Sequence, residues 1–100
     1  MRYSWDSVKD VLNQRNHGLS LADGISALED INCESWEDDR FDYEEERIVT
    51  LGRNKDTILA VVSTVLDSVA EEEKEEQTTH IISVRKATKH EADWYYFGRP

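Results

Sequence analysis

The sequence predicts an α+β domain made of two N-terminal helices, a small antiparallel sheet and a C-terminal helix. The strongest signal is residues 58–66, a nearly continuous apolar run rich in β-branched side chains, which predicts a central strand covered on both faces. Helix start signals lie on both sides of this run, at Ser20 and at Thr88. We expect the helices to pack on one face of the sheet.

The first predicted helix runs from Asp6, a residue type suited to capping, to about Asn16. Apolar residues recur along it at helical spacing, at Val8, Val11 and Leu12. Gly18 suits the left-handed residue that commonly follows a helix. The first helix is therefore expected to end just before this glycine.

A second helix is expected from Ser20 to about Asp30. Ser20 and Asp23 supply the polar side chains of its first turn. Its buried stripe is predicted at helical spacing, at Leu21, Ile25 and Leu28. Gly24 lies inside this helix and weakens it by about 1 kcal/mol relative to alanine.

The predicted sheet is built from strands that follow one another along the chain. Residues 47–51 form one strand, and the polar residues 52–56 form a turn into the central strand. A further strand begins at Thr79 and runs antiparallel to the central strand. Two shorter segments also have strand character, residues 3–5 and residues 33–36.

The strand that begins at Thr79 leads into the densest group of cationic and titratable side chains. The group comprises His80, Ser83, Arg85, Lys86, Lys89 and His90. Alternation gives one face of the strand to Ile82, Val84 and His80. The other face carries Ile81, Ser83 and Arg85, so His80 and Arg85 are opposed unless a bulge intervenes.

The last predicted helix begins at Thr88, because Thr88 and Glu91 have the spacing of a capping box. It carries several aromatic residues, including Trp94, Tyr95 and Phe97. Three of its aromatic residues are adjacent in sequence, so they cannot all face inward.

Two acidic blocks hold the whole negative excess of this single domain, which spans residues 1–100. The formal net charge is −10. Residues 29–46 carry ten acidic residues against Arg40, and residues 67–77 carry six against Lys74. Long-range attraction of nucleic acid is therefore not expected. The blocks are expected either as solvated loops or as surfaces that attract a basic protein partner.

Cys33 is the only cysteine, so neither an internal disulfide nor a multi-cysteine metal site is available. A reducing cytoplasm is the expected compartment. No apolar run approaches the roughly 20 residues of a membrane helix, and no signal peptide is visible. His17, His80 and Cys33 lack the spacing of a metal site, and we expect no metal and no cofactor.

Several short motifs follow one another in a set order. The N-terminal part has Trp5-Asp6, Lys9, Asn13 and His17-Gly18-Leu19-Ser20. Glu46-Arg47 opens the first long strand, and the C-terminal part reads Ile81-Ile82-Ser83-Val84-Arg85-Lys86-Ala87-Thr88 with Glu91 and Tyr95. In this order the motifs resemble those of the BrnT toxins, the toxin half of a bacterial type II toxin–antitoxin pair.

The resemblance implies a RelE-like fold, metal-independent endoribonuclease activity and a cognate antitoxin encoded beside the toxin. Such an antitoxin inhibits by binding and helps repress its own operon, and these toxins usually assemble with it into larger complexes. The cationic positions of the family fall on His17, Arg47, His80 and Arg85. The family usually has arginine where this chain has His80, a basic residue where it has Asn16, and a short hairpin where it has residues 67–77.

Metal-free cleavage of RNA needs a group that moves protons and groups that stabilise the charge of the phosphorane. Histidine suits the first role and arginine suits the second. We therefore assign His80 as a base or acid, with Arg47 and Arg85 holding the scissile phosphate. Alternatively, His80 is an exposed residue at the strand start, Arg85 pairs with an acidic neighbour or a helix terminus, and Arg47 pairs at the surface with Glu45 or Glu46. His17 either joins this site or closes the first helix.

Further residues have two alternative roles each. Lys86, Lys89 and His90 either grip the RNA backbone or form a solvated face of the last helix. Tyr95 either stacks on a base or fills the core. The net charge and His80 support an alternative function, a non-catalytic toxin-fold module that docks an antitoxin-like partner. A third hypothesis is an acidic mimic of nucleic acid that uses residues 29–46 and 67–77.

Overall fold

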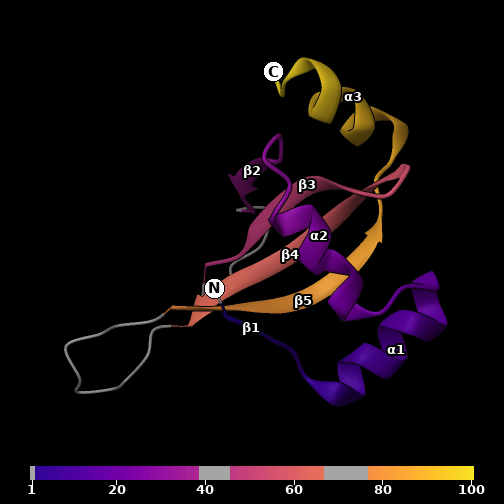
Figure 1. Cartoon of the computed structure of the whole chain (residues 1–100), viewed down its shortest axis with the longest axis vertical. Helices are drawn as coiled ribbons and strands as arrows, with labels where there is room; N and C mark the ends of the chain where they lie inside the picture. The colour runs from indigo at the N-terminus through magenta and orange to yellow at the C-terminus, as the bar shows by residue number, and fades with distance from the viewer. Residues whose placement is uncertain (1, 39–45, 67–76) are drawn as a thin grey trace.

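A five-stranded sheet lies between two layers of helix (Figure 1). The structure is a computed structural model that describes residues 2–38, 46–66 and 77–100. The elements are β1 (Arg2–Ser4), α1 (Ser7–His17), the 3₁₀ turn η1 (Leu21–Asp23), α2 (Gly24–Leu28), β2 (Glu34–Glu37), β3 (Ile48–Asn54), β4 (Thr57–Leu66), β5 (Thr78–Lys86) and α3 (Lys89–Phe97). This arrangement confirms the α+β class.

The predicted central strand is β4, the third strand in the order β1-β5-β4-β3-β2. It pairs antiparallel with β3 and with β5, as predicted. The two short segments are also strands, since β2 pairs antiparallel with β3 and β1 pairs with β5. The β1–β5 pairing is parallel, so the sheet is mixed rather than wholly antiparallel.

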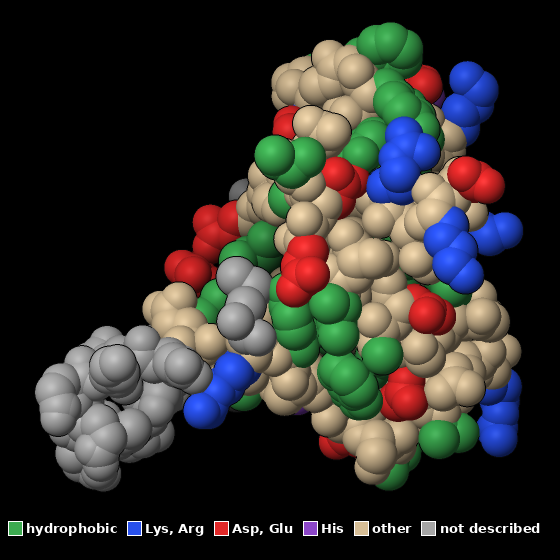
Figure 2. Space-filling model, viewed as in Figure 1, with side chains coloured by type: hydrophobic (Ala, Val, Ile, Leu, Met, Phe, Trp, Pro, Cys, Tyr) green, Lys and Arg blue, Asp and Glu red, His purple; other side chains and the backbone are tan. Residues whose placement is uncertain are grey.

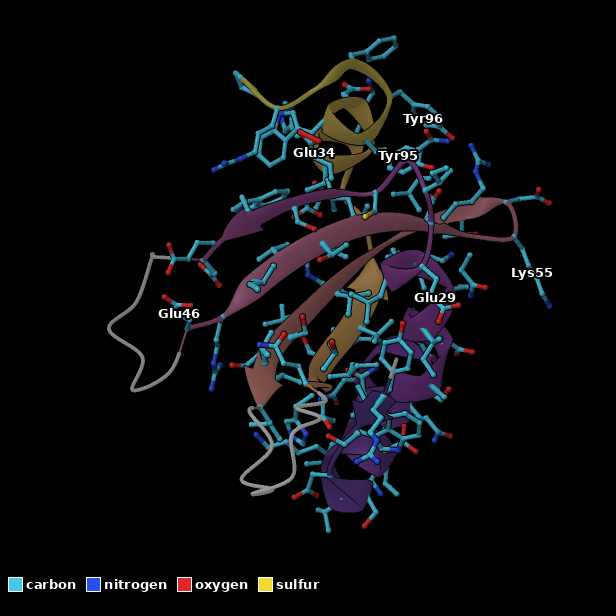
Figure 3. All side chains as sticks on the ribbon, turned by 60° about the vertical axis from the view of Figure 1, so that its left-hand side comes forward. Glu29, Glu34, Glu46, Lys55, Tyr95 and Tyr96 are labelled. Atoms are coloured by element: carbon cyan, nitrogen blue, oxygen red, sulfur yellow. The ribbon has the colours of Figure 1, made fainter. Side chains whose placement is uncertain are left out.

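The helices do not all pack on one face of the sheet, and that prediction is wrong. Leu59 and Val61 face the layer of η1 and α2, where they join a buried cluster with Leu21 and Ala27. Ile58 and Ala60 alternate with them and face the opposite side, where α3 packs. We call the first side the closed face and the second the open face. Figure 3 shows α3 on one side of the sheet and α1 with α2 on the other.

Helix α1 is capped as predicted. Asp6 Oδ1 accepts a hydrogen bond from the backbone N–H of Val8 at 2.8 Å, and Gly18 has a φ of 70°. The apolar stripe of α1 is not buried, because the Val8 side chain is 67% exposed and Leu12 is 45% exposed. The buried residue of the helix is instead the polar Asn13.

Asn13 hydrogen-bonds to the backbone of β5 at a position that β1 does not pair with. Strand β1 pairs only with residues 78–80. The Asn13 amide donates to the carbonyl of Val84 at 2.8 Å and accepts from its N–H at 3.1 Å. It also donates to the carbonyl of Leu19 at 2.8 Å. One side chain therefore replaces a neighbouring strand at this position and fixes α1 against the sheet.

The second predicted helix is split at Gly24 into η1 and α2. Ser20 and Asp23 do cap each other's backbone N–H groups in a reciprocal capping box. A Cβ on Gly24 would lie 2.9 Å from a methyl carbon of Val84. The glycine therefore allows this segment to approach the closed face closely. A 3₁₀ turn and a short α-helix take the place of the single long helix that was predicted.

Strand β3 runs further than predicted, because the turn before β4 is only Lys55 and Asp56. Lys55 takes the left-handed backbone conformation of this tight turn, with a φ of 57°. Gly52, predicted in the turn, is buried inside the strand. A Cβ at Gly52 would lie 2.1 Å from the carbonyl oxygen of Ala27, so glycine is required where α2 crosses β3.

The two acidic blocks are described to different extents. Of the block 29–46, residues 29–38 and 46 are described, and they include β2 and the buried Asp38, so this part is not simply a solvated loop. Of the segment 67–77, only Gln77 is described. Across residues 2–38, 46–66 and 77–100, no helix has the length and apolar character needed to cross a membrane.

Candidate functional site

A β-bulge in β5 decides which side chains face the open side of the sheet. Ser83 pairs with Val62, whereas the next pair along the strands is Ile81 with Ser63. Ile82 is therefore an extra residue in β5, and the alternation shifts by one at that point. Ile81 is buried in the closed-face cluster, which corrects the predicted grouping of Ile81 with Ser83.

The same bulge brings His80 to the face that carries Arg85. His80 pairs with Thr64, which lies two residues from Val62 and so shares its face. Arg85 pairs with Ala60, which lies two residues from Val62 on the other side. Strict alternation opposed His80 and Arg85, and the extra residue removes that opposition.

Arg47 lies on the open face beside Thr64. The backbone carbonyl of Glu46 accepts a hydrogen bond from Thr64 Oγ1 at 2.6 Å. Alternation from Val49 places Arg47 on the same face as Val49. Because Thr64 pairs with His80, a cross-strand row runs from Arg47 through Thr64 to His80.

The open face thus consists of three cross-strand rows. The middle row is Trp36, Val49, Val62 and Ser83. One flanking row ends at Arg85, and the other contains Arg47 and His80. Each flanking row lies two residues, or about 6.6 Å along the strands, from the middle row. Both arginines therefore border the same strip of sheet.

A pocket of about 340 Å³ lies over the middle row. The four residues of that row form its floor, and its walls come from three other segments of the chain. The wall residues are Glu37, Asp38, Arg85, Glu91, Trp94 and Arg99. A pocket of this volume is in the range of small-molecule sites, roughly 300–1,000 Å³.

Arg85 is held in a fixed orientation by Glu91. Its two terminal nitrogens donate to the two carboxylate oxygens of Glu91 at 2.8 and 2.9 Å. Glu91 also accepts from the backbone N–H of Thr88 at 2.8 Å in the predicted capping box. Hydrogen bonds from Arg85 hold the pKa of Glu91 below its ordinary value, against the opposing effect of burial. The start of α3 therefore positions the guanidinium at the pocket wall.

The other predicted catalytic residues lie outside the pocket wall. His80 Nδ1 is 2.8 Å from Ser4 Oγ, and Arg47 is half-buried. His17 is exposed at the last turn of α1, directly before Gly18. The strand register assigns Arg47, His80 and Arg85 to the open face. His17 belongs to α1, which lies on the other side of the sheet (Figure 3).

The predicted RNA-gripping residues are exposed and lie away from the pocket. Lys86 pairs with Leu59 and so belongs to the closed face. Lys89 lies 4.0 Å from Asp93 along the exposed side of α3, a pair that contributes little to stability. His90 is exposed in the first turn of α3.

Tyr95 belongs to a polar network at the end of β3. Its hydroxyl donates to Asp30 Oδ2 at 2.5 Å, which raises the pKa of Tyr95. The same carboxylate oxygen accepts from the backbone N–H of Arg53 at 2.8 Å, and Arg53 donates to the Tyr96 hydroxyl at 3.1 Å. Figure 3 shows both tyrosines toward the β3–β4 turn, whereas Glu46 lies at the other end of β3. The hydroxyl of Tyr95 is therefore hydrogen-bonded at a position away from the pocket.

Arg85 is the one pocket residue that was predicted as a site residue, and Trp36, Trp94 and Arg99 are among those that were not. The two indole rings meet edge to face, with centroids 5.6 Å apart and planes at 84°. The Arg99 guanidinium carbon lies 4.5 Å from the centroid of the Trp36 ring and 5.7 Å from that of Trp94. The alternation of β2 could have placed Trp36 beside Val49, but nothing in the sequence links it to α3.

The chain matches one known protein family, and that match identifies its activity. A family model described as the ribonuclease toxin BrnT of type II toxin–antitoxin systems matches residues 5–91. The chain belongs to the BrnT family. No curated protein sequence matches it. As a BrnT toxin the chain is a ribonuclease toxin of a type II system, with RNA as its target and an antitoxin protein as its partner. Trp94 and Arg99 lie beyond the matched residues.

The electrostatic surface of this BrnT chain is mixed. Figure 2 shows acidic and basic side chains interspersed over the visible face. The pocket has the same character, because the carboxylates of Glu37, Asp38 and Glu91 share it with Arg85 and Arg99. Positive charge is thus provided by individual side chains and does not form a continuous basic surface.

Proposed function

We propose that this BrnT toxin cleaves RNA without a metal ion, on the open face of its sheet. The observation that carries the proposal is that the pocket floor lies between two rows that present cationic side chains. Arg85 borders it at one end, and Arg47 with His80 lies at the other. A phosphodiester over Val62 would meet Arg85, which lines the pocket, and Arg47, whose side chain is long enough to lean over from the opposite row.

In this proposal the two arginines stabilise the charge that develops on the phosphate. Arginine keeps its proton throughout the reaction and offers donors in a planar fork that matches phosphate oxygens. Arg85 is oriented in advance by Glu91, so it does not need to reorganise when the transition state forms. Arg47 acts from the opposite row.

His80 is proposed to accept the proton of the ribose 2′-hydroxyl. The 2′-oxygen then attacks phosphorus, and the bond from phosphorus to the 5′-oxygen breaks. Water supplies the proton that the 5′-oxygen takes up, which leaves a 2′,3′-cyclic phosphate and a 5′-hydroxyl. The contact between His80 Nδ1 and Ser4 Oγ at 2.8 Å orients the ring, so that Nε2 is available for the proton transfer.

The test is cleavage of end-labelled RNA by the purified toxin in excess EDTA. We expect cleavage in the chelator, with cyclic phosphate ends, and loss of that cleavage in Arg85→Ala. Arg15→Ala is the matched control, since Arg15 is an exposed arginine on α1. Products that depend on added metal would contradict the mechanism, as would equal activity of Arg85→Ala and Arg15→Ala.

A second candidate function is a non-catalytic module that docks an antitoxin-like partner. It is favoured by the three carboxylates in the pocket and by the pairing of Arg85 with Glu91. Expression without an antitoxin separates the two functions, because only the nuclease is expected to arrest growth. A tight complex with a small basic protein and no growth arrest would favour the second candidate.

The remaining expectations concern the complex and its location. We propose that the toxin acts in the cytoplasm and assembles with its cognate antitoxin into a larger complex. The mass of the toxin–antitoxin complex, measured by light scattering after co-expression, tests the assembly. A complex no heavier than one toxin and one antitoxin would contradict it.

A further inference from the structure

We infer that Trp36, Trp94 and Arg99 form a subsite that receives one unpaired base of the RNA. The inference deepens the proposed function and rests on it, because it assigns a ligand group to one wall of the same pocket. It also names the substrate class as single-stranded RNA.

The geometry of the two tryptophans suits a flat aromatic ligand. Trp36 is half-buried in the pocket floor, and Trp94 meets it at an interplanar angle of 84°. Both indole rings line the pocket, and this edge-to-face contact supports the Trp36 ring. The Arg99 guanidinium, a planar π-system, already lies over that ring at 4.5 Å. A stacked planar group is therefore accommodated on Trp36.

Arg99 holds this position in a way that a base can replace. Arg99 is exposed. A cation–π contact at an exposed site is weaker than the stacking of a nucleobase on an aromatic ring. We therefore expect a base to take the face of Trp36 and the Arg99 side chain to move aside toward the RNA backbone.

The neighbouring side chains favour a nucleotide over other flat ligands. Arg85 lines the same pocket as both tryptophans. A side chain that can bind a phosphate and a surface on which a base can stack therefore share one site. A nucleotide carries a phosphate and a base together. Bases inside a duplex are stacked on one another, so only an unpaired base can enter. Stacking is tolerant of base identity, which predicts a preference for single strands rather than for one sequence.

The test measures binding of short oligonucleotides by fluorescence polarisation. Each oligonucleotide carries 2′-O-methyl riboses, which remove the attacking hydroxyl and prevent cleavage. A set of otherwise identical strands has one abasic position moved along the sequence, so the charge is constant. One position is expected to weaken binding about 10- to 100-fold, the range for loss of one stacked base.

Protein variants give an independent reading of the same site. Trp36→Ala is expected to weaken binding by about the same factor, and Trp36→Phe is expected to retain most of it, since phenylalanine keeps a stacking face. Tyr96→Ala is the matched control, because it removes an exposed aromatic ring of α3 outside the pocket. The abasic strand should bind Trp36→Ala no more weakly than the intact strand does.

The outcomes separate this inference from the proposed nuclease. Cleavage that depends on Arg85, with no effect of any abasic position, would overturn the subsite and leave the nuclease standing. Base-dependent binding without cleavage would support the subsite and count against the nuclease. Failure of every strand to bind would overturn the subsite. If Trp36→Ala does not fold, the abasic series on the wild-type protein still decides.

Discussion

The two faces of the sheet differ in how completely they are covered. On the closed face Leu21, Leu59, Val61 and Val84 are fully buried beneath η1 and α2. On the open face, among the described residues, α3 packs over Leu51, Ile58 and Ala60, and the pocket lies over the middle row. One set of alternate residues in these strands therefore belongs to the core beneath η1 and α2, and the other set supplies both a second buried cluster and the pocket floor.

This difference assigns stability and activity to separate sets of side chains. Burial of apolar area beneath η1 and α2 stabilises the fold from the closed face, and a second buried cluster, Leu51, Ile58 and Ala60, does so beneath α3. The open face instead leaves Ser83, Arg85 and Trp36 at a pocket wall. Substitutions on the closed face should change the free energy of unfolding, and substitutions at the pocket should change RNA cleavage.

The largest effect is expected from Leu59→Ala on the closed face. Leu59 is fully buried, and truncation of a core leucine lowers the free energy of unfolding by about 2–5 kcal/mol. The matched variant is Val62→Ala, which removes a half-buried side chain from the pocket floor. Urea unfolding should show a much smaller loss for Val62→Ala. Equal losses would remove the distinction between the two faces.

The next effect is expected from Arg85→Ala on the open face. Loss of one preorganised donor to a developing charge lowers the rate about 10²- to 10³-fold. Arg85→Lys keeps the charge but loses the two-point contact with Glu91. Its cleavage rate should therefore lie between that of the wild type and that of Arg85→Ala. Single-turnover cleavage rates make the comparison, with circular dichroism as the check on folding. A fully active Arg85→Lys would show that orientation by Glu91 is unimportant.

A smaller effect is expected from Asn13→Ala at the edge of the closed face. The substitution leaves the N–H and carbonyl of Val84 without the side chain that binds them, at a cost of about 1–3 kcal/mol. Asn16→Ala, an exposed asparagine in the same helix, should change stability very little. Thermal unfolding of the two variants, compared with the wild type, measures the difference.

The smallest expected effect is a pH dependence carried by Glu91. Its folded-state pKa lies below the ordinary value of 4.5, so the pairing with Arg85 contributes stability above that pH. The contribution is lost as the pH falls through the folded-state pKa. The stability difference between wild type and Glu91→Gln should therefore shrink on acidification from about pH 6 to pH 3. A difference that stays constant with pH would show that the charge of Glu91 does not matter.

Local signals in the sequence were enough for most of the elements, the second helix excepted, but not for their arrangement across the two faces. The β-branched run of β4, the Asp6 cap and the Thr88–Glu91 capping box each depend on neighbouring residues, and each is confirmed. The bulge at Ile82 is different, because it depends on how β5 pairs with β4. Strict alternation ignores this bulge, so it placed Ile81 on the wrong face and predicted that His80 and Arg85 lie on opposite faces.

Local signals in the sequence also could not predict which face of the sheet α3 packs against. Its aromatic residues fit either face of a sheet, and the choice depends on which strand residues they meet. Trp94 and Tyr95 pack near Leu51, Ile58 and Ala60, so α3 covers the side opposite to α2. The pocket formed by Trp36, Trp94 and Arg99 follows from that choice, which explains why none of the three was predicted.

The most direct test of the central claim, that RNA binds the open face, uses the three tryptophans as reporters. Trp5 packs against the closed-face cluster, whereas Trp36 and Trp94 line the pocket. Their indole N–H signals can be followed in a ¹H–¹⁵N spectrum during titration with an uncleavable single-stranded RNA. We expect the signals of Trp36 and Trp94 to shift with saturable dependence on RNA and that of Trp5 to stay in place. A shift confined to Trp5 would contradict the account.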